Sequence, residues 1–540
     1  MKTITRSLAA GIVGVALAST PALATHKTHP VTGEVLSDNQ TYTYVSIDES
    51  SSLDPGLIED VSGAAVARDL FEGLLTQNAD GTLAPGVATR YTTNADKTVY
   101  TFHLRRNARW SNGDPVTAHD FEFAWKRAVS PELASPYSWY MEIMSIKNGA
   151  AVINGEKDKD ELGAKALDDY TFQVTLEASL PYFPSMVVHT TTMPVPTKIV
   201  NAFGDEWTKP GNMVSNGAYV LSEHVLNERQ SRVRNDLYWN NDATILDKVT
   251  TVIIQDENAA FNRYIAGEVD QTAPPSGQFN ALKKSMPNDV HTNPRLCTYY
   301  YNFNMEKAPF DDKRVRQAAA LTLDRAGFLK GVLKGSGSLG NDNVMDPFPT
   351  ADKSVKQRKK DLAAAKKLMA AAGSTGFKVD LSTYHRDDID LLAPFLKSSW
   401  AEIGIDLNLG KISDSYYTAP WDANTAKKQE SNFWLESNCG ITEFGHRGAP
   451  AEYLTRVFRS NGDWNAAHIK DTKLDAAIDE YNTATTPAKA MVASKKIQEL
   501  SLDLSPYIIA YFEVRTSAVR KGLKGFYTNG MGQFDAAATA

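Results

Sequence analysis

Hydrophobic and polar residues follow two different periods along the chain, and each period predicts a different element. Residues 99–104 (VYTFHL) alternate with the period of two that is typical of a half-buried strand. A turn sequence, SNGDP, follows at 111–115, and Thr117 and Asp120 then have the spacing of a helix capping box. Asp311 likewise precedes an amphipathic segment and is expected to cap a helix there.

A helix, a glycine and a strand follow one another twice in the second half of the chain. Residues 361–372 are rich in Ala, Lys and Leu, stop at Gly373 and run into the alternating stretch 377–384. The same order recurs over 391–409, with Gly404 as the break. This alternation predicts crossover units of a mostly parallel sheet, so the expected fold class is α/β or mixed α+β.

The first residues have the pattern of a secretory signal peptide. Lys2 and Arg6 precede an apolar run at 8–18, and the small-residue sequence ALA ends at Ala24. We expect cleavage after Ala24, so that residues 1–24 are removed and the protein reaches the periplasm. Because Thr25 and not a cysteine follows, we expect no lipid anchor.

Composition excludes several classes of partner. Loss of Lys2 and Arg6 takes the formal charge from −7 to −9, and acidic and basic residues are mixed along the chain, which argues against nucleic acid. Beyond the signal peptide, no apolar stretch approaches the roughly 18 residues of a spanning helix. With 540 residues and 42% hydrophobic content, the chain is long enough for two to four domains.

The sequence contains no motif that would assign a reaction. It has no nucleophile elbow, phosphate-binding loop or zinc-protease motif. His385, His446 and His468 are scattered without the spacing of metal ligands. We therefore expect a protein that is not an enzyme and has no metal or cofactor.

The chain has two cysteines, Cys297 and Cys439. In an oxidising compartment a disulfide between them is the natural interpretation. On spacing alone, two unrelated buried thiols are the alternative.

An ordered set of short motifs runs from about Thr41 to about Gly525. The set comprises SLDP at 52–55, RDLFEGLL at 68–75, APGVA at 84–88, TFHLR at 101–105, WSNGDPVTA at 110–118, SPY at 135–137, NGAY at 216–219, YWNN at 238–241, CTYYY at 297–301 and PFDDKRVR at 309–316. Together these motifs resemble the family 5 solute receptors, the periplasmic oligopeptide-binding proteins that serve ABC transporters.

The resemblance implies a two-lobed fold of the large three-domain type, which closes over its ligand at a hinge. A discontinuous lobe I is expected at 25–71, 197–296 and 509–540, an inserted domain II at 72–196, and lobe III at 297–508. In close family members the cysteines matched here to Cys297 and Cys439 are joined, which favours the disulfide.

The resemblance also carries ligand contacts over to this chain. Expected contacts are Glu59, Val61, Tyr137, Cys439, Gly440, Asn465, Tyr511 and Phe512. Cys439 and Gly440 are matched to the strand that pairs with the ligand backbone.

The expected anchors for the ligand termini are missing. The family holds the amino terminus with an aspartate in a Cys-Ala-Asp-Tyr-Asn-Glu-Pro context, and the alignment puts Ile441 at the position of that aspartate. Leu435 replaces an arginine, and Ala426 or Lys427 replaces a second basic residue. Either Glu443, Arg447 and Lys427 take over, or the ligand lacks ordinary charged termini.

The sequence therefore predicts a monomeric periplasmic receptor that delivers an oligopeptide or modified peptide to an ABC import permease in the inner membrane. A non-peptide solute, such as a glycoconjugate, an opine-like compound or a haem or nickel chelate, is the alternative within the fold. A secreted hydrolase is a remote third reading, because fold alone does not define function.

Overall fold

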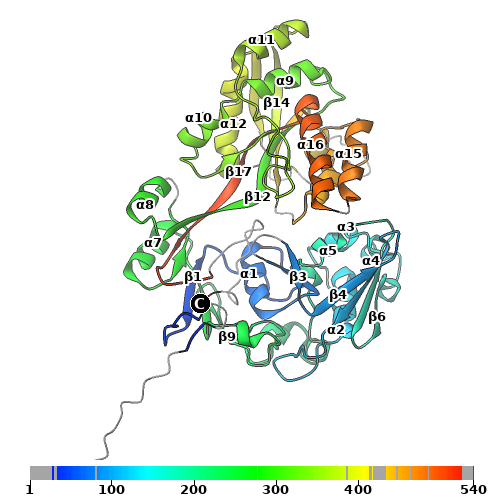
Figure 1. Ribbon diagram of the computed structural model, residues 1–540, viewed down its shortest axis with the longest axis vertical. Coiled ribbons are helices and arrows are strands. Elements are labelled where there is room, and N and C mark those ends of the chain that lie inside the picture. The colour runs from blue at the N-terminus through cyan, green and yellow to red at the C-terminus, as the bar shows by residue number, and fades with distance from the viewer. Residues whose placement is uncertain are drawn as a thin grey trace, which may run out of the picture.

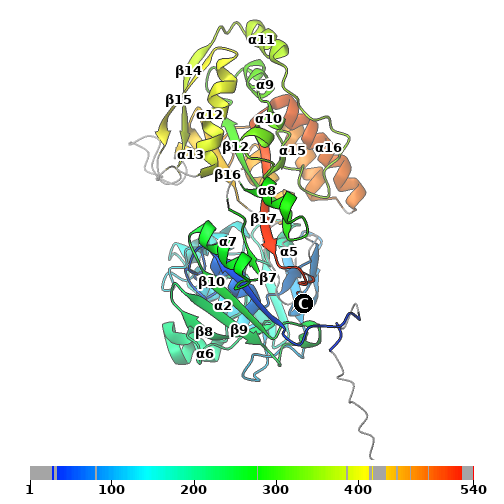
Figure 2. The ribbon, with the colours of Figure 1, turned by 90° about the vertical axis from the view of Figure 1, so that its left-hand side faces the viewer.

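The structure is a computed structural model. It describes residues 27–29, 33–78, 82–275, 278–384, 387–412, 416, 433–445, 448–462, 464–484, 486–525 and 539. The chain forms an upper and a lower lobe that are joined by strands β12 and β17 (Figures 1 and 2). Expectations for the signal peptide at 1–24 fall outside the described residues.

One large sheet extends through both lobes. Its order is β15-β14-β16-β12-β17-β11-β1-β10-β9-β8, with β13 paired to β17. The strands are β1 (Thr41–Ser46), β8 (Tyr219–Val225), β9 (Arg229–Arg234), β10 (Lys248–Ile253), β11 (Gln271–Thr272), β12 (Val290–Phe303), β13 (Ser338–Leu339), β14 (Phe377–Thr383), β15 (Ile405–Ile412), β16 (Cys439–Phe444) and β17 (Tyr507–Val519).

The lower lobe contains the amino-terminal part of the chain and two further sheets. These are β2 (Leu75–Gln77) with β3 (Leu83–Pro85), and the four-stranded β4 (Ala88–Thr93), β5 (Val99–Leu104), β7 (Thr171–Thr175) and β6 (Ala164–Asp168). Its helices are α1 (Val61–Leu70), α2 (Ala118–Val129), α3 (Ser138–Ile143), α4 (Gly149–Ile153), α5 (Phe183–Met186), α6 (Thr197–Phe203), α7 (Glu257–Ala266) and α8 (Phe279–Ser285).

The upper lobe packs helices on both faces of its part of the sheet. The helices are α9 (Lys313–Leu321), α10 (Arg325–Gly331), α11 (Leu362–Ala371), α12 (Asp387–Ala401), α13 (Phe433–Glu436), α14 (Pro450–Tyr453), α15 (Thr472–Asn482) and α16 (Pro487–Leu504). Because side chains alternate along a strand, Tyr299 and Tyr301 enter the core with α9 and α12, whereas Tyr300 enters the core with α15 and α16.

Several local expectations are confirmed. The strand at 99–104 is β5, and Thr117 and Asp120 form the expected capping box at the start of α2. Gly373 and Gly404 follow α11 and α12 with positive φ angles of 70° and 85°, which glycine adopts without strain. The strands after them, β14 and β15, pair in parallel as expected.

Two expectations were wrong. Asp312, and not Asp311, caps α9, because its carboxylate accepts a hydrogen bond from the Arg314 backbone. The large sheet is mixed and not mostly parallel, since β12 runs antiparallel to both β16 and β17. Long strands that cross from lobe to lobe dominate this sheet, and their direction is independent of the local crossover units.

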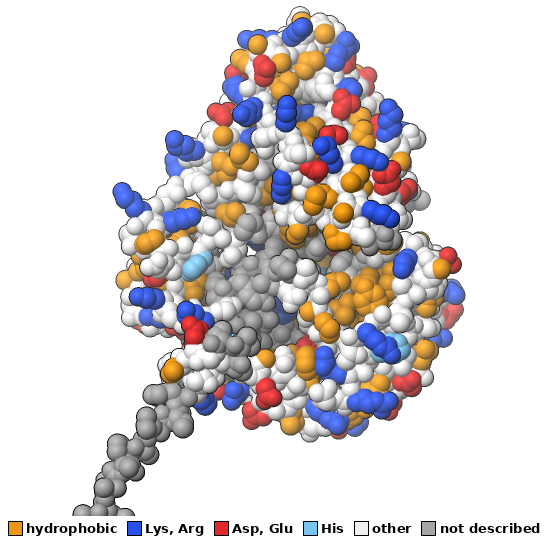
Figure 3. Space-filling model, viewed as in Figure 1, with side chains coloured by type: hydrophobic (Ala, Val, Ile, Leu, Met, Phe, Trp, Pro, Cys, Tyr) orange, Lys and Arg blue, Asp and Glu red, His pale blue; other side chains and the backbone are white. Residues whose placement is uncertain are grey.

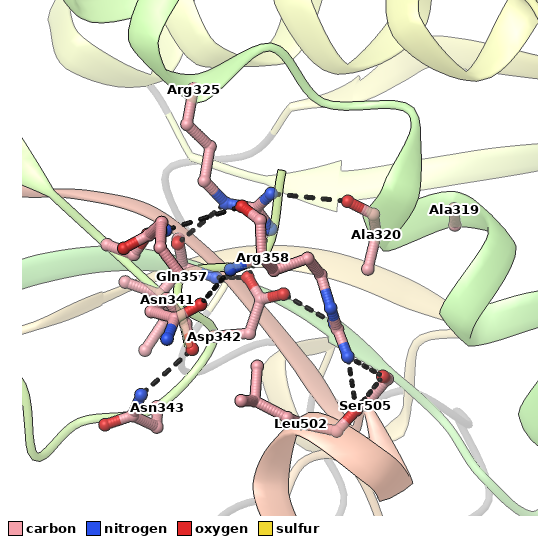
Figure 4. A network of polar contacts seen from close by, with 12 residues as sticks. Ala319, Ala320, Arg325, Asn341, Asp342, Asn343, Gln357, Arg358, Leu502 and Ser505 are labelled. Atoms are coloured by element: carbon pink, nitrogen blue, oxygen red, sulfur yellow. Dashed lines mark hydrogen bonds and ion pairs between the residues drawn. The ribbon is translucent and has the colours of Figure 1, made fainter. Parts of the chain in front are cut away.

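A buried carboxylate ties the upper lobe together. Asp342 is fully buried and lies 2.5 Å from Nη2 of Arg325 and 2.6 Å from Nη1 of Arg358 (Figure 4). It also accepts a hydrogen bond of 3.0 Å from the backbone of Ile509 in β17. Arg358 donates in turn to Ser505 Oγ, 3.2 Å away at the end of α16. The network joins three separate segments around one negative charge.

Candidate ligand-binding site between the lobes

A row of aromatic rings crosses from the lower lobe to the upper lobe. The His189 ring stacks between Tyr140, at a centroid distance of 4.2 Å, and Tyr137, at 5.1 Å. Trp139 lies 5.0 Å from Tyr137 and 6.5 Å from Trp464 of the upper lobe. These spacings are those of favourable aromatic pairs, so the row forms an apolar contact between the lobes.

Arg456 reinforces this contact. Its guanidinium carbon lies 4.9 Å above the Trp464 ring, and its Nη2 donates a hydrogen bond of 3.3 Å to the carbonyl oxygen of Ile143, at the end of α3. A cation held over an aromatic face and bonded to the opposite lobe fixes the spacing of the two lobes on this side.

Charged residues gather where β12 and β17 pass between the lobes. The register of the two strands breaks between Pro294 and Thr298, so β12 bulges there. In this bulge Arg295 Nη1 lies 3.1 Å from Glu513 Oε2, and both side chains are mostly buried. The hinge strands thus hold a pair of opposite charges that is mostly shielded from solvent.

Glu443, at the end of β16, extends this group. Its Oε1 accepts a hydrogen bond of 3.4 Å from Cys297 Sγ, and its Oε2 accepts one of 3.4 Å from the hydroxyl of Tyr384. Burial, and then the negative charges of Glu513 and Glu443, raise the pKa of Cys297 well above its ordinary value. Cys297 is therefore a neutral thiol that donates to a carboxylate.

The expected disulfide between Cys297 and Cys439 is wrong for this structure. Both cysteines are free and buried. Cys439 is paired with Phe303, whereas Cys297 precedes Thr298, the partner of Phe444. Six residues of strand separate the two sites, or about 20 Å, and a disulfide needs Cα atoms within about 7 Å.

The same register favours a second alignment around Cys439. Extended by one residue, it brings Gly445 opposite Cys297, so a cysteine joined to Cys297 would stand at 445. The position of the family's aspartate then moves from Ile441 to Arg447, and that of the arginine moves from Leu435 to Ile441. Ile441 is fully buried in the core, and Arg447 lies outside the described residues.

Strand β16, which is expected to pair with the ligand backbone, already pairs with β14 over part of that edge. Gly440 pairs with Asn302 of β12 on one edge and with Ser382 of β14 on the other. Cys439 is buried in the core, and the Thr383 hydroxyl bonds to the carbonyl of Ile441. The backbone edge that extends beyond β14 therefore begins near Thr442.

The other expected contacts fall into two groups. Glu59 and Val61 are exposed at the start of α1, and Tyr137 belongs to the aromatic row that reaches the upper lobe. Tyr511 and Phe512 are buried in β17 on opposite faces of the sheet.

Asn465 has a structural contact. Its side chain bonds to both the backbone nitrogen and the carbonyl of Ile469, which fixes the loop beside Trp464. His446 and Lys427, like Arg447, lie outside the described residues.

Sequence reasoning missed Trp139, His189, Arg456 and Trp464. The run Tyr137-Ser138-Trp139-Tyr140 was a visible signal, because three aromatic residues in four are rarely all needed in a core. Trp464 and Arg456 carried no local signal, since their role depends on a contact between distant segments.

Within the described ranges, no group of His, Cys, Asp and Glu side chains could hold a metal ion. No helix in the same ranges is long and apolar enough to cross a membrane. Two lobes on a strand hinge, with aromatic and paired charged residues at their junction, define a hinged solute-binding receptor.

Comparison with known proteins defines the family. The model of the bacterial extracellular solute-binding proteins, family 5 (middle region), matches residues 82–443. The periplasmic oligopeptide-binding protein OppA of Salmonella typhimurium is 37% identical over 97% of this chain and 96% of its own. The probable deoxycholate-binding periplasmic protein YgiS of Escherichia coli is 32% identical over 91% of each. The chain belongs to family 5 of the extracellular solute-binding proteins, and it is a binding receptor, not an enzyme.

Solved structures also indicate the state of the hinge. MppA, a periplasmic murein tripeptide-binding protein, superposes in its unliganded open form with a TM-score of 0.81, at 32% identity, over 93% of this chain and 98% of that one. Haemophilus influenzae OppA in complex with RPPGFSPFR gives 0.67, at 30% identity, over 93% and 99%. The arrangement of the two lobes is therefore more similar to that of the open form of MppA than to that of the peptide complex of OppA.

Proposed function

We propose that this receptor captures an oligopeptide or modified peptide in the periplasm and delivers it to an ABC import permease in the inner membrane. The observation that carries the proposal is the match to OppA over almost the full length of both chains. The protein is secreted through a cleaved signal peptide and acts as a monomer. Its domains are a discontinuous lobe I at 25–71, 197–296 and 509–540, domain II at 72–196 and lobe III at 297–508.

The ligand lies between the lobes and uses the backbone edge at 442–445. Its main chain pairs with this edge, because every peptide offers the same amide groups whatever its side chains. Glu443 contributes a carboxylate beside that edge. Glu59, Val61 and Tyr137 contact the ligand from the lower lobe when the hinge closes. Exclusion of water then strengthens each polar contact.

The ligand is not held by the family's acid and base. In the second alignment, Ile441 is apolar where a base is expected, and Arg447 is basic where an acid is expected. A buried terminal charge without a partner costs several kcal/mol. Unmodified tri- to pentapeptides should therefore bind weakly, and a peptide with a blocked or altered amino terminus should bind well.

A non-peptide solute is the second candidate. It is favoured by the relative YgiS, whose name describes deoxycholate binding, and by the aromatic row, which offers flat apolar surfaces to a rigid ligand. The contacts proposed for Glu59, Val61 and Tyr137 would then recognise the shape of the ligand and not a peptide backbone.

Two measurements test the proposal. Mass spectrometry of molecules that co-purify with the protein should find peptide masses, and calorimetry should compare unmodified with N-acetylated tripeptides. Glu443→Gln should reduce the free energy of peptide binding by about 1.5–3 kcal/mol if the carboxylate accepts a charged hydrogen bond. Glu499→Gln is the control, since its exposed carboxylate lies 4.0 Å from Lys495 on α16. A co-purified lipid or sterol, with no heat from any peptide, would favour the second candidate.

A further inference from the structure

The lobes also touch on the side of the hinge opposite the aromatic row. Helix α8 of the lower lobe lies next to α10 of the upper lobe, and both helices lie to the left of β12 and β17 in Figure 1. The aromatic row and Arg456 lie on the other side, where α3 lies below α15 (Figure 1). The hinge strands thus run between two interlobe contacts.

The contact behind the hinge is formed by a side chain and a turn. Nδ2 of Asn280, in α8, donates a hydrogen bond to the carbonyl oxygen of Lys334, just after α10. Gly335 follows with a φ of 87°, and a Cβ at this position would lie 3.4 Å from Oδ1 of Asn280. The turn therefore fits directly against Asn280.

An open groove of about 410 Å³ surrounds this contact. Asn280 lines it from the lower lobe, and Leu329, Lys330 and Leu339 are among the residues that line it from the upper lobe. Lys and Arg side chains project from the same region in the space-filling view (Figure 3). Because its walls belong to different lobes, the width of the groove depends on the hinge angle.

Closure affects the two sides of the hinge in opposite ways. The lobes already touch at the aromatic row, and the hinge strands lie between that contact and the bond from Asn280 to Lys334. A closing rotation that tightens the aromatic-row side would therefore break the bond between Asn280 and Lys334. A contact made in only one state shifts the equilibrium toward that state by its own free energy.

We propose that Asn280 and the turn at Lys334–Gly335 form a clasp that stabilises the open state and so lowers the apparent affinity for ligand. The effect on affinity rests on the ligand-driven closure proposed above, whereas the clasp itself does not. Affinity falls with the population of the binding-competent state, so a clasp of this kind sets how readily the receptor closes.

The clasp can be tested without ligand. Single-molecule FRET between dyes at Lys198→Cys and Lys378→Cys, whose native side chains are 78% and 88% exposed, reports the separation of the lobes. Bound ligand is first removed by unfolding and refolding. Asn280→Ala should raise the ratio of closed to open molecules roughly two- to tenfold, the range expected for loss of one hydrogen bond. Asn280→Trp should raise it further, because the ring fills a groove that is narrow only when the lobes are open.

Ala281→Trp is the control, since Ala281 is exposed on the same helix but does not line the groove. An unchanged ratio in both Asn280 variants would overturn the clasp, and so would an equal rise in Ala281→Trp. Failure of the receptor to bind peptides would leave this result unaffected, because no ligand is present.

Discussion

The sulfur of Cys297 lies 3.4 Å from Oε1 of Glu443, on the strand that also carries Cys439 at its far end. The thiol therefore links two neighbouring strands through a hydrogen bond to a carboxylate. Burial also raises the pKa of Cys439 well above its ordinary value. Two neutral, enclosed thiols follow from this arrangement.

We predict that both cysteines are free. Thiol titration of the denatured, unreduced protein should give two thiols per chain. The folded protein at pH 8 should react slowly, because the thiolate is the reactive form and both pKa values are raised. A denatured, unreduced sample that gives no thiol would show that the cysteines are joined in solution.

We predict that Asp342→Asn lowers the free energy of unfolding by on the order of 3 to 5 kcal/mol, because it leaves the buried Arg325 and Arg358 without a negative partner. Asn tolerates the positive φ of 53° at this position, so the loss reports charge and not backbone strain. Urea unfolding followed by circular dichroism measures it. The control is Asp503→Asn at an exposed pair with Lys313, which should change stability by less than about 1 kcal/mol. If Asp342→Asn and Asp503→Asn lowered the free energy of unfolding equally, the buried network around Asp342 would not be stabilising.

We predict that Asp346→Asn stabilises the protein, in contrast to Asp342→Asn. Burial raises the pKa of its carboxyl above the ordinary value, and its Oδ2 has no hydrogen-bond partner among the described residues. Because the pKa of Asp346 is higher in the folded than in the unfolded protein, its contribution to stability is fully present below the unfolded pKa. That contribution is lost as the pH rises through the folded pKa. Asp346→Asn should therefore raise the melting temperature at pH 7, and the gain should vanish below about pH 4. A gain that is independent of pH would contradict the role of the charge.

We predict that Trp139→Ala widens the unliganded receptor. The pair that Trp139 makes with Trp464 contributes about 0.5–1.5 kcal/mol to holding the lobes together on the side of the aromatic row. Small-angle scattering should show a larger radius of gyration for this variant. Tyr91→Ala removes an aromatic side chain that is 40% exposed within the lower lobe and should leave the radius unchanged. An unchanged radius in both variants would mean that Arg456 alone maintains the spacing.

Local structure was largely predictable from the sequence, and long-range register was not. The strand at 99–104 and the capping box at Thr117 depend on residues within a few positions of each other, so their pattern is sufficient. The pairing of Cys297 with Glu443 depends on how two strands align whose paired residues are 146 positions apart, and the period of two along a strand is compatible with many registers. Asp311 and Asp312 differ by one residue, which is within the usual uncertainty of a helix boundary.

The site was predictable only where it depends on single segments. Tyr137 was expected as a ligand contact because it belongs to a local motif, whereas Trp464 and Arg456 are identified by contacts that exist only when both lobes are in place. Cys439 and Ile441 were assigned to the ligand through an alignment, and that assignment stays a prediction because the register of β12 and β16 also allows an alignment shifted by six residues.

Strands β12 and β17 each continue without interruption from one lobe into the other, which determines how the molecule responds to mechanical load. A force that pulls the lobes apart along these strands would act on their antiparallel hydrogen bonds in shear, so many bonds would resist together. Torsion about the strands meets much less resistance at the bulge between Pro294 and Thr298, where the ladder is already broken. The receptor is therefore stiff in extension and compliant in torsion.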